Sequence, residues 1–246
     1  MGAMEIVGDE PPSEDRIRER HERLLERLRA RASDAGHDPA RLRIVAVTKT
    51  WPMEVAHAAV AAGITRLGES RVQEAEPKIA AMPDAEWHFI GRLQSNKARR
   101  AVRGFSVIHS VDSVALLRRV VELAAEEGRR PELLVQVNVS GEEAKAGLAP
   151  ETLLRREAVD AVREAGVVGL MTIAPMGIGD AEARTHFARL RELRDRLSQA
   201  AGLPLPQLSM GMTADAEAAA AEGATLVRIG TALFGPRPET LLSSKA

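Results

Sequence analysis

Short apolar runs alternate with helical stretches along most of the chain. The clearest run, Ile44–Val47, is a block of apolar residues, three of them β-branched, which is typical of a strand buried on both faces. Comparable candidate strands begin near Ile44, Thr65, Trp87, Val107, Leu133, Val167, Gln207 and Leu226. A helical stretch separates each pair, so the pattern predicts an α/β fold, a single (β/α)8 TIM-type barrel. A doubly wound open sheet shares the same local pattern and is the alternative.

The helical stretches have recognisable ends. Several finish in a glycine just before the next candidate strand, where glycine can form the left-handed cap that returns the chain to the sheet. These glycines are Gly63, Gly104, Gly128, Gly166, Gly202 and Gly223. Before the first strand, Ile17, Leu24, Leu25 and Leu28 form one apolar stripe and predict an extra N-terminal helix over residues 13–35. We expect residues 1–12 to be a disordered tail and residues 13–246 to form the barrel domain.

Composition excludes several classes of function. Lys and Arg number 34 against 35 Asp and Glu, so the balance gives no support to a nucleic-acid surface. No apolar run approaches the roughly 18 residues that span a bilayer. Cysteine is absent, which suits a cytoplasmic protein, and the six histidines show no metal-binding spacing, so no metal is expected. Few aromatic residues are present, and a monomer is the expected state.

A lysine stands where the first candidate strand ends. With a period of two, Val45, Val47 and Lys49 share one face, so the strand would carry the Lys49 ammonium to the end of a buried surface. In a barrel, the carboxyl ends of the strands form the functional face. The alternative is a lysine that has simply reached solvent at the end of a strand.

The last two candidate strands end in small and hydroxyl residues. Ser209, Gly211, Gly230 and Thr231 bring hydroxyls and exposed backbone amides to adjacent loops. The loops after strands seven and eight are the usual phosphate site of such barrels, and small residues let the backbone approach an anion. Ordinary turn residues are the alternative interpretation.

Arg228 is predicted to point into the barrel. Its neighbours Val227 and Ile229 would face the helices, so the guanidinium would need a partner inside. That partner is either an inward carboxylate or an acceptor atom of a ligand.

A lysine, a phosphate site and an inward arginine at one end of a barrel suggest an aldehyde held as a Schiff base. Pyridoxal 5'-phosphate fits all three groups. Met171 on the sixth strand can lie against a flat ring through its sulfur, or can be an ordinary core methionine.

At this point the residues match a known family. The motifs are AVTKTWP (46–52), GESRVQE (68–74), WHFIGRLQSNK (87–97), VQVNVS (135–140) followed by Lys145 and Gly147, GLMTI (169–173), LSMGMTAD (208–215) and VRIGTALFG (227–235). Together they closely resemble the pyridoxal phosphate homeostasis proteins over about residues 40–236.

The resemblance implies a fold like the N-terminal barrel of alanine racemase, with pyridoxal phosphate held as a Schiff base on Lys49. It implies that Arg228 contacts the pyridine nitrogen. The residues that it implies at the phosphate are Ser209, Gly211, Gly230 and Thr231. Ser70 and Arg71 stand where the family usually has Asn and Tyr, and Ser70 is counted among the cofactor-binding residues.

Two functions remain open at this stage. A charged arginine at the pyridine nitrogen disfavours its protonation and weakens the electron sink of pyridoxal phosphate catalysis. Tyrosine is absent, so the phenol base of alanine racemases is missing and Lys49 is the one obvious base. We therefore expect a non-catalytic carrier involved in intracellular pyridoxal phosphate homeostasis, with apo-enzymes as possible recipients. The alternative is an amino-acid racemase or lyase with His88 or His109 as second base.

Overall fold

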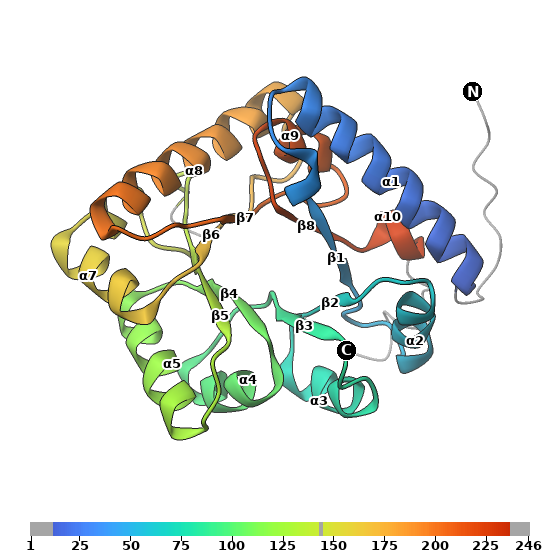
Figure 1. The fold of residues 1–246 in the computed structure, drawn as a ribbon, viewed down its shortest axis with the longest axis horizontal. Coiled ribbons are helices and arrows are strands. Elements are labelled where there is room, and N and C mark those ends of the chain that lie inside the picture. Colours follow the sequence, from blue (N-terminus) through green and yellow to red (C-terminus); the bar gives the residue numbers. More distant parts are fainter. Residues whose placement is uncertain (1–11, 143–144, 237–246) are drawn as a thin grey trace.

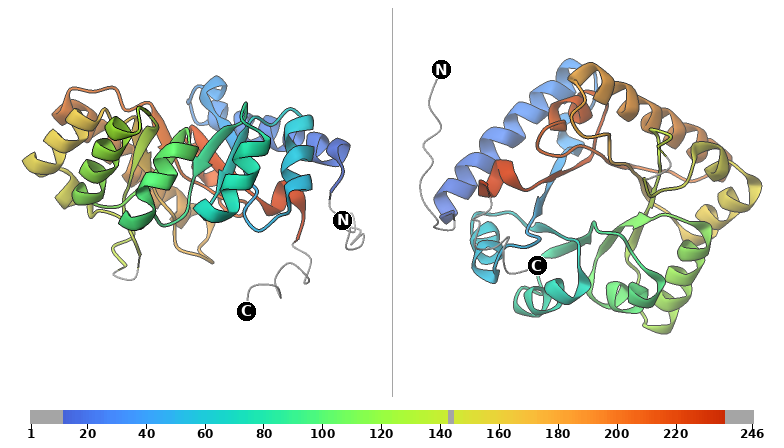
Figure 2. Two further views of the ribbon diagram at one scale, coloured as in Figure 1. Left: turned by 90° about the horizontal axis from the view of Figure 1, so that it is seen from below. Right: turned by 180° about the vertical axis from the view of Figure 1, so that it is seen from behind.

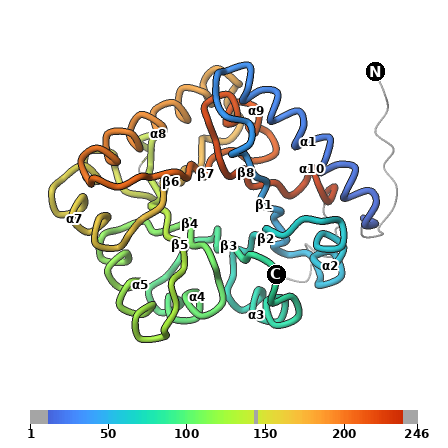
Figure 3. The backbone as a smooth tube through the Cα atoms, viewed as in Figure 1, coloured from blue at the N-terminus to red at the C-terminus, as the bar shows by residue number. Residues whose placement is uncertain are grey.

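Eight short strands run parallel and close into one barrel, drawn end-on in Figure 1 and as a tube in Figure 3. The computed structural model describes residues 12–142 and 145–236. The strands are β1 (Arg43–Val47), β2 (Arg66–Glu69), β3 (Glu86–Phe89), β4 (Val107–Val111), β5 (Glu132–Gln136), β6 (Gly169–Met171), β7 (Gln207–Ser209) and β8 (Leu226–Ile229). Pairing of β1 with β8 closes the barrel, which confirms the predicted fold and excludes the open sheet.

Helices surround this barrel (Figure 1), and Figure 2 shows the same ring from the side and from behind. They are α1 (Glu14–Asp34), α2 (Met53–Ala61), α3 (Val72–Ala81), α4 (Ala98–Gly104), α5 (Val114–Glu126), α6 (Pro150–Leu153), α7 (Arg156–Ala165), α8 (Asp180–Ala201), α9 (Ala216–Ala221) and α10 (Thr231–Phe234). Two 3-10 turns, η1 (Pro39–Arg41) and η2 (Ser95–Lys97), complete the described elements. None of the described helices is long and apolar enough to cross a membrane.

Alternation along each strand produces two separate cores. On β1, Ile44 and Ala46 pack outward in the large layer between strands and helices. Val45 points the other way, into a small inner cluster with Met171 of β6 and Leu134 of β5. This is the period-two pattern expected for a barrel strand. On β8, Val227 and Ile229 belong to the outer layer, so Arg228 points inward as predicted.

The N-terminal helix α1 completes the wall where the barrel's own helices are short. Helices α9 and α10 have 6 and 4 residues, and α1 with 21 residues packs across both of them (Figure 1). Arg20 donates a hydrogen bond to the Leu233 carbonyl (3.0 Å), and Arg27 pairs with Glu217 (2.8 Å). The predicted helix over residues 13–35 is therefore an integral part of the domain.

Sequence-based boundaries agree with the structure except in detail. The sixth strand begins at Gly169 rather than near Val167. Five of the six glycines predicted to end helices have positive φ, as a left-handed cap requires. Gly104 differs because it is the last residue of α4, where an added Cβ would lie 3.0 Å from the Ile79 Cδ1 atom. Its small size serves helix packing. The predicted tail, apart from Pro12, lies outside the described residues.

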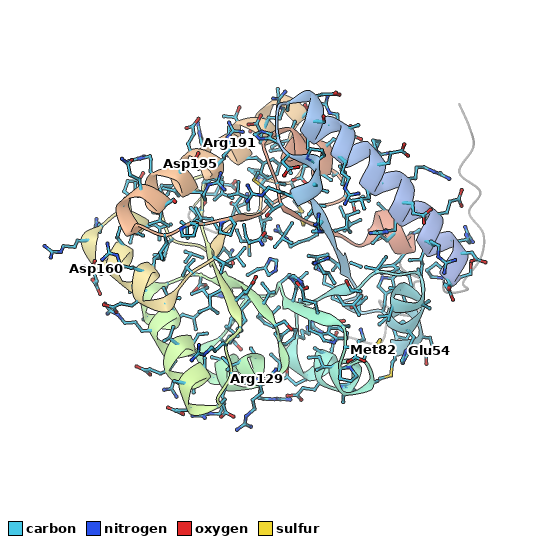
Figure 4. The ribbon with its side chains drawn as sticks, viewed as in Figure 1. Glu54, Met82, Arg129, Asp160, Arg191 and Asp195 are labelled. Carbon is cyan, nitrogen blue, oxygen red and sulfur yellow. The ribbon has the colours of Figure 1, made fainter. Side chains whose placement is uncertain are left out.

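Charged side chains line the outside of the helical ring. The labelled Arg129 and Asp160 in Figure 4 project away from the barrel. Asp160 is paired with Arg163 of the same helix at 2.8 Å. Exposed pairs of this kind contribute little to stability, so the fold depends on its two apolar layers.

Candidate functional site

Lys49 lies two residues after the last residue of β1, at the carboxyl end of the barrel, and is half-buried. The backbone turns immediately after it, with the Trp51 amide donating to the Thr48 carbonyl at 3.1 Å. Thr50 within this turn has φ of 67°, in the left-handed region that a β-branched residue rarely adopts. Such strain is typical of positions where a function fixes the backbone.

A buried ion pair contacts the residue that begins this turn. Lys78 of α3 lies 2.7 Å from the Glu69 carboxylate and donates to the Thr48 carbonyl at 2.9 Å. The same carboxylate oxygen accepts from the Thr48 hydroxyl at 2.8 Å, and both ionic side chains are almost fully buried. The chain segment that presents Lys49 is therefore held at Thr48 by two polar contacts, whose partners are themselves joined by the ion pair.

Sequence reasoning missed the role of Lys78. The available signal was its position on α3, three residues after Ala75 and six after Val72, because all three lie on the buried stripe of that helix. A lysine within a buried stripe requires an anionic partner. Only the folded chain identifies that partner as Glu69.

Arg228 lies on β8 beside Val45 of β1 and is 4% exposed. Its guanidinium donates to the Ser209 hydroxyl (2.6 Å) and to the Thr172 carbonyl (2.9 Å). These are its side-chain hydrogen bonds within the described residues, and they use two of its five N–H donors. Burial lowers the pKa of Arg228 to about 10, while the charge of Asp215 acts in the opposite direction.

No carboxylate of the described residues lies within ion-pair distance of this arginine. An inward carboxylate, one of the two partners considered from sequence, is therefore not found there. A buried cation with neutral partners and spare donors fits a ligand that brings negative charge and acceptor atoms.

The four residues predicted to bind the phosphate differ in how deeply they are buried. Ser209 is fully buried, with its hydroxyl shared between Arg228 and the His109 ring (2.8 Å). Gly211 has φ of 88°, and an added Cβ would lie 2.5 Å from the Ala219 Cβ, so the turn into α9 requires glycine. Gly230 is the N-cap of α10 and Thr231 is its first residue, where the first amides lack intrahelical partners, and Thr231 is exposed.

Gly230 is half-buried and Thr231 is exposed, and their amides are suited to an anion. The Ser209 hydroxyl is buried and accepts a hydrogen bond from Arg228. Phosphate binding by Ser209, Gly211, Gly230 and Thr231 stays a prediction.

Ser70 and Met171 come from opposite sides of the barrel. Ser70 directly follows β2 and is half-buried, and Gly91 lies so close that an added Cβ would be 2.1 Å from the Ser70 carbonyl oxygen. Met171 is buried in the inner cluster, so its side chain points inward as predicted. Their contacts to a ligand remain predictions.

His88 and His109 are buried inside the barrel. Their rings are joined by a 2.8 Å hydrogen bond between His88 Nδ1 and His109 Nε2. His88 Nε2 also contacts Glu86 (2.9 Å), and His109 Nδ1 contacts Ser209. Burial lowers the pKa of His109 well below its ordinary value, with His88 and Arg228 adding to the effect. All four ring nitrogens are therefore occupied by protein partners.

Two cavities lie at opposite ends of the barrel. One of about 210 Å³ opens between the loops after β3, β5 and β6, beside Arg92, Asn138 and Lys145. The other, of about 350 Å³, lies at the amino ends of the strands beside Arg66, Glu86 and other residues. None of the eight predicted ligand residues lines either cavity. The described residues contain no cluster of His, Asp or Glu that could hold a metal ion.

Comparison with known proteins finds relatives over most of this chain. A family model described as the alanine racemase N-terminal domain matches residues 21–238. A protein named pyridoxal phosphate homeostasis protein from Pseudomonas aeruginosa is 44% identical over 90% of this chain and 96% of its own length. A protein of the same name from Synechocystis is 43% identical, over 81% of this chain and 93% of its own.

Solved structures agree with this assignment. PipY from Synechococcus elongatus, determined without PLP, is 44% identical with a TM-score of 0.76 and covers 86% of this chain and 99% of its own. The form of PipY with PLP bound is 43% identical, covers 86% of this chain and all of its own, and has a TM-score of 0.74. An alanine racemase from Clostridium difficile is 15% identical, covering 87% of this chain and 57% of its own with a TM-score of 0.65, and shares the fold.

Proposed function

This chain belongs to the family of pyridoxal phosphate homeostasis proteins, and we propose that it binds pyridoxal 5'-phosphate as a Schiff base on Lys49 and takes part in intracellular homeostasis of that cofactor. The observation that carries the proposal is the buried guanidinium of Arg228, which has no carboxylate within ion-pair distance among the described residues. Lys49 stands at the end of the adjacent strand. The relatives' shared name and the PLP-bound form of PipY support the same ligand.

Each part of the ligand has a residue suited to it. An amine such as that of Lys49 condenses with the cofactor's aldehyde and releases water. Arg228 supplies N–H donors and positive charge, which favour an unprotonated ring nitrogen. The amides that begin α10 at Gly230 and Thr231 suit the phosphate. The Lys78–Glu69 pair holds the turn that presents Lys49.

We further propose that the protein holds the cofactor without turning over amino acids. A second base would be needed opposite Lys49, and tyrosine is absent from the sequence. His88 and His109, the other candidates, are 1% and 0% exposed with both nitrogens of each ring occupied. A reversible covalent bond suits a carrier that releases its cofactor to apo-enzymes. Exchange of amino-acid α-protons with heavy water by the loaded protein would contradict this proposal.

The first experiment is reduction of the loaded protein with borohydride. Pyridoxal phosphate is added to wild type, and we expect a visible absorbance band that borohydride removes while fixing one cofactor to the Lys49 peptide. Lys49→Ala should lose the band and the label. Peptide mass spectrometry identifies the labelled residue.

Lys145→Ala is the matched control, because Lys145 lines the cavity at the same end of the barrel. This variant should label like wild type. Absence of a band in wild type would overturn the proposed site. So would a label that is lost in Lys145→Ala but kept in Lys49→Ala.

A further inference from the structure

A single line of polar groups crosses the inner core of the barrel from one end to the other. It begins at Glu86, the first residue of β3, and continues through His88 to His109 of β4. From His109 it passes to Ser209 at the end of β7, and from Ser209 to Arg228. Its four contacts measure 2.9, 2.8, 2.8 and 2.6 Å in that order. The line therefore joins the amino-end cavity to the predicted ligand site.

The chemistry of the two ends fixes the direction of every hydrogen bond in this line. An ionised Glu86 can only accept, so a neutral His88 donates from Nε2 and accepts at Nδ1. His109 must then donate from Nε2 and accept at Nδ1, which makes the Ser209 hydroxyl a donor to His109. Arg228 can only donate, and it donates to the Ser209 oxygen. With both rings neutral, each shared position carries one proton and no group is left without a partner.

This order aligns the dipoles of three neutral groups between a cation and an anion. Arg228 is 4% exposed and Glu86 is 39% exposed at the far face. The hydrogen bond from His88 lowers the pKa of the Glu86 carboxyl below its usual value, and Arg66 at 3.5 Å acts in the same direction. Hydrogen bonds in such a chain polarise one another, most strongly in a low-dielectric interior.

We propose that Glu86 is the remote counter-ion of Arg228, and that His88, His109 and Ser209 are positioning residues that transmit its charge through the barrel. The counter-ion stabilises the buried guanidinium in the folded protein. It also partly neutralises the field that Arg228 presents to an anionic ligand. Removal of the Glu86 charge therefore affects stability and anion binding in opposite directions.

The stability test is a double-mutant cycle between Glu86→Gln and Arg228→Met. We expect Glu86→Gln to lower the folding equilibrium constant of wild type about tenfold, the size of one hydrogen bond to a charged group. In the Arg228→Met background the same change should have little effect, because the cation is gone. Equal effects in both backgrounds would show that Glu86 acts locally and would overturn the proposal.

Two control variants separate the line from its surroundings. Arg66→Gln removes the ion pair at Glu86 but leaves the line intact, and it should show no coupling to Arg228. Glu132→Gln removes a carboxylate from the same cavity that is not part of the line. Coupling of either control to Arg228→Met as strong as that of Glu86→Gln would identify a general charge effect.

A second measurement does not depend on whether Arg228→Met folds. Nitrogen-15 NMR of the imidazole rings of the wild-type protein should place the His109 proton on Nε2. A His109 proton on Nδ1 would mean that His109 donates to Ser209 and accepts from His88, which breaks the proposed order and also overturns the proposal. Neither measurement uses a ligand.

The binding test rests on the proposed function. Glu86→Gln should bind pyridoxal phosphate roughly threefold more tightly than wild type despite its lower stability, since the positive potential at the site rises. Glu132→Gln should change affinity less, and weaker binding by Glu86→Gln would contradict the counter-ion role. If wild type itself forms no complex, the proposed function fails while the cycle and the NMR measurement still decide the role of Glu86.

Discussion

At the scale of single residues, the segment around Lys49 combines strain with support. Thr50 has a positive φ, and the Thr48 carbonyl accepts from both the Trp51 amide and Lys78. A residue in a sparsely populated conformation persists only when its surroundings fix it. The buried Lys78–Glu69 pair supplies that constraint, so it determines where the Lys49 amine is presented.

Replacement of Lys78 by Met should destabilise the protein by about 3–5 kcal/mol, because it leaves the Glu69 carboxylate buried without its cation. Urea unfolding gives the loss in free energy. The double variant Lys78→Met with Glu69→Gln removes both charges and should recover much of the stability. Equal losses in the single and double variants would show that the unpaired charge is not the cause.

At the scale of elements, neighbouring helices are joined by charged side chains on the outer surface. Glu127 follows the last residue of α5 and contacts Arg99 (2.5 Å) and Arg103 (2.6 Å) of α4. These hydrogen bonds lower the pKa of the Glu127 carboxyl from 4.5 to about 2. The carboxylate therefore stabilises the contact between α4 and α5 wherever it is ionised.

A pH dependence follows from the sign of that shift. The stabilisation is complete above about pH 4.5, the ordinary value, and disappears as the pH falls to about 2. Glu127→Gln should lower the melting temperature at pH 6 and should have no effect below pH 2. Thermal melts across this range test the expectation. Glu151→Gln, which changes an exposed carboxylate on α6, is the control, and an equal effect of both variants would contradict the assignment.

At the scale of the whole molecule, α1 joins the barrel's first and last segments. It packs on α2, α9 and α10, and its buried stripe includes Ile17 and Leu28, both fully buried. The short α9 and α10 leave apolar surface that α1 covers, so the domain should unfold as one unit.

Leu28→Ala should therefore destabilise the entire barrel by about 2–5 kcal/mol. Circular dichroism reports on all helices, and the fluorescence of Trp51 and Trp87 reports on the barrel. Both signals should shift together in denaturant. Leu25→Ala is the matched control, because Leu25 is half-buried on the same helix and its truncation should cost less. A barrel signal unchanged by Leu28→Ala would mean that α1 unfolds separately.

The sequence by itself determined the barrel, the extra helix and the inward position of Arg228. These properties follow from local periodicity: apolar runs mark strands, a period of two assigns faces, and strand ends define the functional rim. Lys49 was predicted in the same way, since its position relative to Val45 and Val47 needs no distant contact. Seven local motifs also indicated the family that the comparisons confirmed.

Only the tertiary structure decided which polar groups meet. His109 and Ser209 are 100 positions apart and become partners through barrel closure. Lys78 reaches Thr48 across 30 positions because α3 packs against β2, which is paired with β1. Packing of Gly211 against Ala219 of α9 is a second requirement for glycine that the local sequence does not show, and its contact with a ligand stays a prediction. Local sequence fixes the direction of a side chain, but its partners depend on contacts between distant segments, which form only when the barrel closes.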